Sequence, residues 1–128
     1  DMMNKKEVTM NFNEYQEKAS KFDTFSYETF IKEGAKVNHL GMLEKVLGLA
    51  GESGEACDKI KKLIRDNNGE ISEEKKKELA KELGDILWYL AMVSKYLGME
   101  FSKVAEMNIE KLQDRFERNK IHGSGDNR

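Results

Sequence analysis

Proline, the residue that most often ends a helix, is absent from all 128 residues, while apolar side chains recur at helical spacing along most of the chain. Charged residues make up 36% of the sequence, and no segment shows a convincing strand-like alternation of apolar and polar residues. The length suits one domain. The sequence therefore predicts an all-α domain built as an antiparallel helical bundle.

Four helical segments are predicted, and the short connections between the last three favour antiparallel packing. Their approximate ranges are 12–22, 39–66, 72–97 and 102–120, with a weak helical turn over 27–32. The expected capping residues are Asn11 or Asn13 for the first segment, Ser72 for the third and Ser102 for the fourth. Gly69 and Gly98 are expected to end the second and third segments.

The whole chain, 1–128, is predicted to be a single domain with an N-terminal extension over 1–10 and a polar, glycine-rich tail over 121–128. By itself that tail would be predicted disordered. Each long helix carries an apolar stripe that is expected to form the core. The stripes consist of Leu43, Val46, Leu47, Ala50, Cys57, Ile60 and Ile64 in the second segment, Leu79, Leu83, Ile86, Leu87, Leu90 and Leu97 in the third, and Ala105, Ile109, Leu112 and Phe116 in the fourth.

Net charge, apolar run length and cysteine content indicate the expected partners and compartment of the protein. The net charge of −2 favours neither nucleic acid nor an acidic membrane surface as a partner. No apolar run reaches the length of a membrane span. The single cysteine, Cys57, cannot form an internal disulfide and suits a reducing compartment. We therefore expect a soluble, cytoplasmic protein that binds neither nucleic acid nor membrane.

The run "GLAGESGEA" places Glu52 and Glu55 one helical turn apart, on the side of the helix away from its apolar stripe. Gly48, Gly51 and Gly54 surround them, and each glycine costs a helix about 1 kcal/mol relative to alanine. A solvated charged face has no use for these glycines. They indicate that a ligand or a packed helix approaches the carboxylates closely.

A second carboxylate pair, Glu82 and Asp85, has the same spacing in "ELGDILWYLAMV". The residues after it are apolar on nearly all sides, which is typical of a covered helix, and covered carboxylates are costly unless a cation pairs with them. On neighbouring antiparallel helices the two pairs can converge, and four oxygen donors suit Mg²⁺ or Mn²⁺. The alternative is an ion-pair network in which Lys59 or Lys62 neutralises the carboxylates.

The fourth segment carries a polar and basic stripe beside its apolar one, formed by Asn108, Lys111, Arg115 and Arg118. Alone, it would be read as an exposed basic surface. Together with a divalent metal site it is what a polyphosphate requires, because metal and cations must offset several negative charges.

The two acidic pairs, separated by 26 residues, resemble the MazG-like all-α nucleoside triphosphate pyrophosphohydrolases. The segments "GLAGESGEACDKIKK", "KELGDILWYLAMV", "NIEKLQDRF" and "GSGDNR" are similar to this family. The resemblance implies metal-dependent hydrolysis of a nucleoside triphosphate to the monophosphate and pyrophosphate. It also implies dimers or tetramers in which a neighbouring subunit completes the pocket.

Residue roles follow from the resemblance by position. The implied ligands of Mg²⁺ are Glu52, Glu55, Glu82 and Asp85, and either Glu52, Glu55 or the metal activates water. The implied substrate contacts are Lys59, Lys62, Asn108, Lys111 and Arg115 for the phosphates and Tyr89 for the sugar or base. The tail is expected either to fold over the nucleotide, with Arg128 at a phosphate, or to remain flexible.

Two alternatives stay open. The first is a pyrophosphohydrolase of narrower specificity, for dUTP, dCTP or phosphoribosyl-ATP. The second is a non-catalytic helical oligomer with ion-paired carboxylates, whose stability would not respond to Mg²⁺ and nucleotide.

Overall fold

The computed structural model describes residues 9–25, 39–119 and 123–126, and within these ranges it contains four helices and no strand. The helices are α1 (Phe12–Ser20), α3 (His39–Asn67), α4 (Glu73–Tyr96) and α5 (Phe101–Glu117). The predicted all-α class is confirmed, and each helix matches one predicted segment. The helical turn predicted over 27–32 lies outside the described residues. No described helix is long and apolar enough to cross a membrane.

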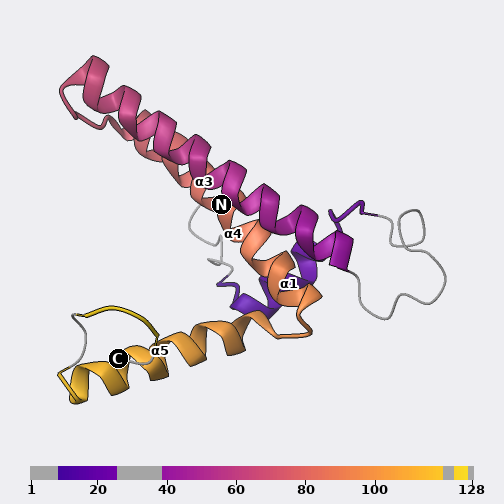
Figure 1. Ribbon diagram of the computed structural model, residues 1–128. Helices are drawn as coiled ribbons and strands as arrows, with labels where there is room; N and C mark the ends of the chain where they lie inside the picture. Colours follow the sequence, from indigo (N-terminus) through magenta and orange to yellow (C-terminus); the bar gives the residue numbers. More distant parts are fainter. Residues whose placement is uncertain (1–8, 26–38, 120–122, 127–128) are drawn as a thin grey trace, which may run out of the picture.

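Helices α3 and α4 form a long antiparallel hairpin and lie side by side along their length (Figure 1). Helix α3 ends where Asn68 and Gly69 adopt left-handed backbone angles, with φ of 52° and 78°. Helix α4 begins at the predicted cap, because the side chain of Ser72 accepts a hydrogen bond of 3.2 Å from the backbone of Lys75. These turn residues bring the two acidic segments face to face.

The core lies at the open end of the hairpin, where α1 packs against α4 and the start of α5 (Figure 1). The side chains of Ala19, Ala91, Met92 and Phe101 are buried there, and the indole of Trp88 donates a 3.1 Å hydrogen bond to the carbonyl of Ala19. Among the described residues this core is small.

Side chains of α1 cap the N-terminus of α5, and the prediction that Ser102 caps it is wrong. The helix begins at Phe101, so Ser102 lies inside its first turn. The side chain of Gln16 in α1 accepts a 3.1 Å bond from the Phe101 backbone, and Asn13 accepts one of 2.9 Å from Ser102. Beyond this point α5 runs away from the hairpin, and among the described residues it contacts α1 and α4 but not α3 (Figure 1).

Most of the predicted core stripes lie on the surface of this chain. Helix α3 turns the opposite face towards α4, so that Lys45 is 2% exposed and Leu63 7% exposed. Of the stripe residues, only Leu79, Ile86, Leu87 and Ala105 are half-buried. The exposed ones are Leu43, Val46, Leu47, Ala50, Cys57, Ile60, Ile64, Leu83, Leu90, Leu97, Ile109, Leu112 and Phe116. The assignment of these residues to the core of the single chain is therefore wrong.

The exposed stripes of α3 and α4 form one apolar face on the hairpin. Viewed along the chain direction of α3, Ile60 lies about 80° around the helix axis from Glu52. Viewed along the chain direction of α4, Leu90 lies about 80° from Glu82 in the same direction of rotation. Because the helices are antiparallel and Glu52 faces Glu82, that shared sense places both on one side of the hairpin. We define the apolar face by five exposed residues, Val46, Ile60, Leu83, Leu90 and Leu97.

A buried ion pair joins the end of α1 to α3. The ammonium of Lys45 lies 2.9 Å from the carboxylate of Asp23 and within 6 Å of the rings of Phe25, Trp88 and Tyr96. Burial works to raise the pKa of Asp23, but hydrogen bonds from Tyr96 and Lys45 outweigh it and hold that pKa below its usual value. This contact ties the segment that follows α1 to α3.

Candidate functional site

Three carboxylates meet across the α3–α4 hairpin. Glu52 from α3 and Glu82 and Asp85 from α4 each place one carboxylate oxygen within 4.8 Å of the others. Glu82 is 7% exposed, Glu52 is half-buried and Asp85 is exposed. We call these three residues the acidic cluster. The i, i+3 spacing on α4 puts two of them on the side that faces α3.

The acidic cluster is short of positive charge. One oxygen of Glu52 and one of Glu82 are buried and have no hydrogen-bond partner within the described chain. The pKa of Glu52 is raised, first by desolvation and then by the charges of Glu55, Asp85 and Glu82. Unpartnered carboxylate oxygens in close apposition are the donor set that Mg²⁺ or Mn²⁺ prefers, so these residues fit a divalent cation.

Glu55, the fourth predicted ligand, lies at the edge of this site. Its side chain is exposed and does not belong to the group of oxygens within 4.8 Å of one another. Its charge nevertheless contributes to the raised pKa of Glu52, so the two carboxylates are neighbours. The structure thus brings three of the four predicted ligands together and leaves Glu55 beside them.

Among the described residues, Lys59 is the cation that reaches the cluster. Its ammonium pairs with the carboxylate of Glu82, and this hydrogen bond is the main cause of the raised pKa of Lys59. Lys62 instead pairs with Asp58 at 2.8 Å. Of the two lysines considered as neutralising partners in the sequence, Lys59 occupies that position and Lys62 does not.

Tyr89 lies one turn beyond Asp85 and packs on the backbone of α3 at Gly48. A Cβ atom at Gly48 would overlap the Tyr89 ring, so glycine is required there for the helices to approach. The Tyr89 ring also meets Trp88 edge to face, with centroids 5.0 Å apart. At Gly51 and Gly54, by contrast, no described atom other than those of the chain neighbours and the adjacent backbone of α3 lies within 4 Å of an added Cβ.

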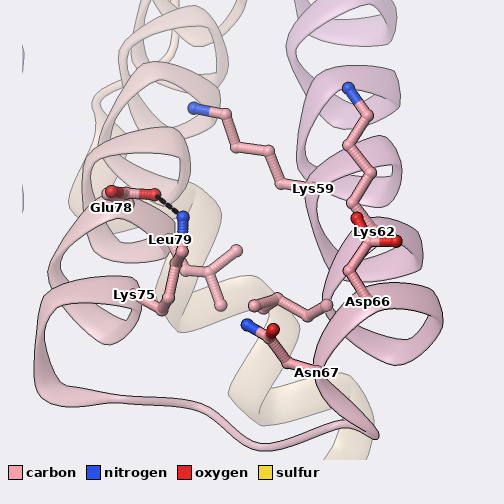
Figure 2. Close-up of a pocket in the computed structure, with 8 residues that line it drawn as sticks. Lys59, Lys62, Asp66, Asn67, Lys75, Glu78 and Leu79 are labelled. Atoms are coloured by element: carbon pink, nitrogen blue, oxygen red, sulfur yellow. Dashed lines mark hydrogen bonds and ion pairs between the residues drawn. The ribbon is translucent and has the colours of Figure 1, made fainter.

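A cleft of about 320 Å³ opens between the far halves of α3 and α4, next to the acidic cluster. Figure 2 shows Lys59 and Lys62 on α3 opposite Lys75 on α4. Lys75 pairs with Glu78 at 3.1 Å. The sequence reasoning missed Lys75, although its spacing to Glu78 and Glu82 places it on the α4 face that carries Glu82.

The residues predicted on α5 are not brought to the acidic cluster. Asn108 and Lys111 are exposed, and the helix makes no contact with α3 in the part of the chain that the structure describes. Arg115 is 4% exposed because the segment 123–126 covers it, and its guanidinium donates a 2.7 Å bond to the carbonyl of Asp126. This part of the tail is placed against α5 rather than disordered, and Arg128 lies outside the described residues.

Comparison with known proteins identifies the family. The MazG nucleotide pyrophosphohydrolase domain matches residues 41–119, which span nearly all of α3, α4 and α5. The chain belongs to this family, as its acidic motifs predict. The Gene 37 protein of Mycobacterium phage L5 is 44% identical over 88 residues, covering 69% of this chain and 77% of that protein. No solved structure matches the chain.

Proposed function

We propose that the chain is a metal-dependent nucleoside triphosphate pyrophosphohydrolase that converts an NTP or dNTP and water to the monophosphate and pyrophosphate. In this reaction the oxygen of water bonds to the α-phosphorus, and the bond from that phosphorus to the bridging oxygen of pyrophosphate breaks. The observation that carries the proposal is the pair of buried, unpartnered oxygens on Glu52 and Glu82. A catalytic cation supplies the missing charge and activates water.

The acidic residues have two roles in this proposal. Glu52, Glu82 and Asp85 hold Mg²⁺, which Mn²⁺ could replace, and Glu55 completes the set from the edge of the cluster. Glu52 or Glu55 accepts the proton of the attacking water.

The phosphates extend from the acidic cluster into the lysine-lined cleft, where Lys59 and Lys62 are the proposed contacts (Figure 2). Both lysines lie on the α3 surface that continues from Glu52 towards the hairpin turn. Tyr89 lies on the other side of the cluster, beside Gly48. We assign it to the sugar or base, which would then be held at the open end of the hairpin.

A second copy of the chain is part of this proposal. The apolar face leaves large side chains in water along both helices of the hairpin, and soluble monomers rarely expose contiguous apolar surface of this kind. A homodimer or homotetramer would cover it. Because α5 does not reach its own α3 within the described chain, Asn108 and Lys111 would contact phosphate in a neighbouring copy. Arg115 is covered by segment 123–126 and bonded to Asp126, so its contact with phosphate requires that segment to move away.

The test is pyrophosphate release from a panel of NTPs and dNTPs with and without Mg²⁺. We expect Mg²⁺-dependent release that falls about a hundredfold or more in Glu52→Gln and Glu82→Gln. Glu74→Gln is the matched control, because Glu74 is exposed on the same helix as Glu82 and lies outside the cluster. The panel, extended to phosphoribosyl-ATP, also identifies an enzyme specific for dUTP, dCTP or that substrate.

Silence across the panel would support the non-catalytic oligomer if Glu82→Gln were also more stable than the wild type and indifferent to Mg²⁺. Activity that survives in Glu82→Gln would contradict the proposed metal site while leaving the reaction in place.

A further inference from the structure

The side chains of the paired residues Lys59 and Glu82 differ in their exposure to water. Glu82 is 7% exposed and has one oxygen without a partner in the described residues, so it cannot turn to water. The side chain of Lys59 is 43% exposed and can leave the pair without entering a less polar environment. The carboxylate is held in place, whereas the ammonium that neutralises it is free to move.

We propose that Lys59 is an exchangeable counter-ion of the acidic cluster. In the metal-free protein its ammonium neutralises Glu82, and when a divalent cation takes that position Lys59 moves into the neighbouring cleft and binds a phosphate group. This inference rests on the proposed function, because it requires a cation at the cluster and a polyphosphate in the cleft.

The exchange follows from charge. Three carboxylates converge on a cluster that Lys59 alone reaches among the described residues, and it contacts only one of them. One oxygen of Glu52 and one of Glu82 stay buried without a partner in the described chain, so the pairing with Lys59 leaves negative charge uncompensated. A divalent cation interacts with all three carboxylates at once and carries twice the charge, so it outcompetes a single ammonium.

When Lys59 leaves Glu82, the cleft gains an unpaired positive charge. In the metal-free protein all three lysines of the cleft are paired, Lys62 with Asp58 at 2.8 Å and Lys75 with Glu78 at 3.1 Å. Release of Lys59, the cleft residue that pairs with Glu82, adds one unpaired positive charge to this surface. The cation and the phosphate therefore bind with positive coupling, although they bind in different places.

The first test measures Mn²⁺ binding by titration calorimetry without nucleotide. Lys59→Met removes the competing ammonium, and we expect it to bind Mn²⁺ about tenfold more tightly than the wild type. Lys59→Arg keeps the charge and should bind as the wild type does. Lys61→Met is the matched control: Lys61 lies on the same helix, pairs with Asp58 at 3.0 Å and points away from α4. It should change the affinity less than about twofold because of screening.

The second test measures binding of inorganic pyrophosphate. With saturating Mg²⁺ we expect Lys59→Met to bind it about tenfold more weakly than the wild type, since one charged hydrogen bond is lost. With a chelator present, the two proteins should bind pyrophosphate equally weakly. If Lys59 only stabilised the hairpin, Lys59→Met would not strengthen the binding of Mn²⁺ while weakening the binding of pyrophosphate.

Circular dichroism identifies a variant that does not fold, in which case Lys59→Gln replaces Lys59→Met. Equal Mn²⁺ affinity in the wild type and the variant would overturn the exchange and leave the proposed reaction intact. Equal pyrophosphate affinity with Mg²⁺ present would overturn the movement into the cleft. A wild type that binds no Mn²⁺ would overturn both this inference and the metal site on which it rests.

Discussion

Glu52 and Glu82 each bury a carboxylate oxygen that has no partner in the described chain, and they do so within 4.8 Å of each other's donor atoms. Such an arrangement opposes folding, because burial and like charge both disfavour ionised carboxylates. Proteins keep it where a ligand supplies the missing charge. At the scale of single residues, stability alone does not explain the acidic cluster, and the proposed cation would supply the missing charge.

Gly48→Ala tests the contact between α3 and Tyr89. The added methyl group would overlap the Tyr89 ring, so we expect a loss of about 1–3 kcal/mol in the free energy of unfolding, despite the better helix propensity of alanine. Chemical denaturation measures it. Gly51→Ala is the control, since no described atom other than those of the chain neighbours and the adjacent backbone of α3 lies within 4 Å of its added Cβ, and it should stabilise the metal-free protein by up to about 1 kcal/mol.

Gly51→Ala also tests whether substrate or a second copy of the chain approaches α3 at the acidic cluster. If substrate or a second copy approaches α3 at Gly51, then Gly51→Ala should lower activity while raising stability. A Gly48→Ala protein as stable as the wild type would contradict the packing of Tyr89 against α3.

The Asp23–Lys45 pair should dominate the acid sensitivity of the fold. Asp23→Asn leaves Lys45 with only the exposed Glu44, which lies 3.0 Å from its ammonium, so we expect a loss of about 2 kcal/mol in the free energy of unfolding near neutral pH. The folded pKa of Asp23 is lowered, so the stabilisation is complete above the unfolded value of 3.8 and is lost as the pH falls through the lowered folded value. Denaturation curves of wild type and variant should therefore stay apart down to about pH 4 and meet only below the lowered folded pKa of Asp23. A difference independent of pH would mean that packing, not charge, holds this contact.

At the scale of elements, hydrogen bonds from a side chain of α1 join α4 to α5. Gln16 uses its whole amide: its oxygen accepts from the backbone of Phe101, and its nitrogen donates to the carbonyls of Ala91 and Met99 at 3.2 and 3.0 Å. Glu100, at the N-cap position of α5, makes no capping hydrogen bond through its side chain. The direction of α5 therefore depends on a residue more than eighty positions earlier in the chain.

Gln16→Ala should loosen this junction. Three hydrogen bonds are lost and a partly buried backbone donor is left unsatisfied, so we expect a loss of about 2 kcal/mol in the free energy of unfolding. Hydrogen exchange should also become faster at the first turn of α5. Ser102→Ala is the control, because Ser102 does not cap the helix and its removal should change stability by less than about 0.5 kcal/mol. A larger effect at Ser102 than at Gln16 would contradict the cross-helix cap.

At the scale of the whole molecule, the small core at the end of the hairpin contrasts with the extent of apolar surface along it. Leu83 and Leu90 on α4 and Leu97 at its C-cap recur every seven residues, the spacing of helices that pack along their length against another helix. A second hairpin placed on the apolar face would form a larger core from residues that one chain leaves exposed.

Leu90→Lys tests this arrangement. Leu90 is 40% exposed in the single chain, so lysine should be tolerated there, but at the centre of a covered face it would bury an unpaired charge. We expect the variant to sediment as a monomer with reduced activity, whereas the wild type sediments as a dimer or tetramer. Phe22→Lys is the control, because Phe22 is 74% exposed and lies outside the apolar face. A wild type that sediments as a monomer would contradict the proposed assembly.

The sequence alone determined the helices and the family. Helical periodicity, the cap at Ser72 and the left-handed turn at Gly69 are local properties, so the elements end within a few residues of their predicted ends. The acidic pairs were likewise readable, because their spacing along each helix sets which side they share.

Tertiary structure decided which faces meet. An apolar stripe identifies a face that must be buried but not the surface that buries it, so residues such as Ile60 and Leu90 were assigned to a core that one chain does not form. Only the packed hairpin shows that Lys59 pairs with Glu82 and that Gln16 caps α5. These contacts join residues distant in sequence, and no local pattern encodes a partner that folding alone brings within reach.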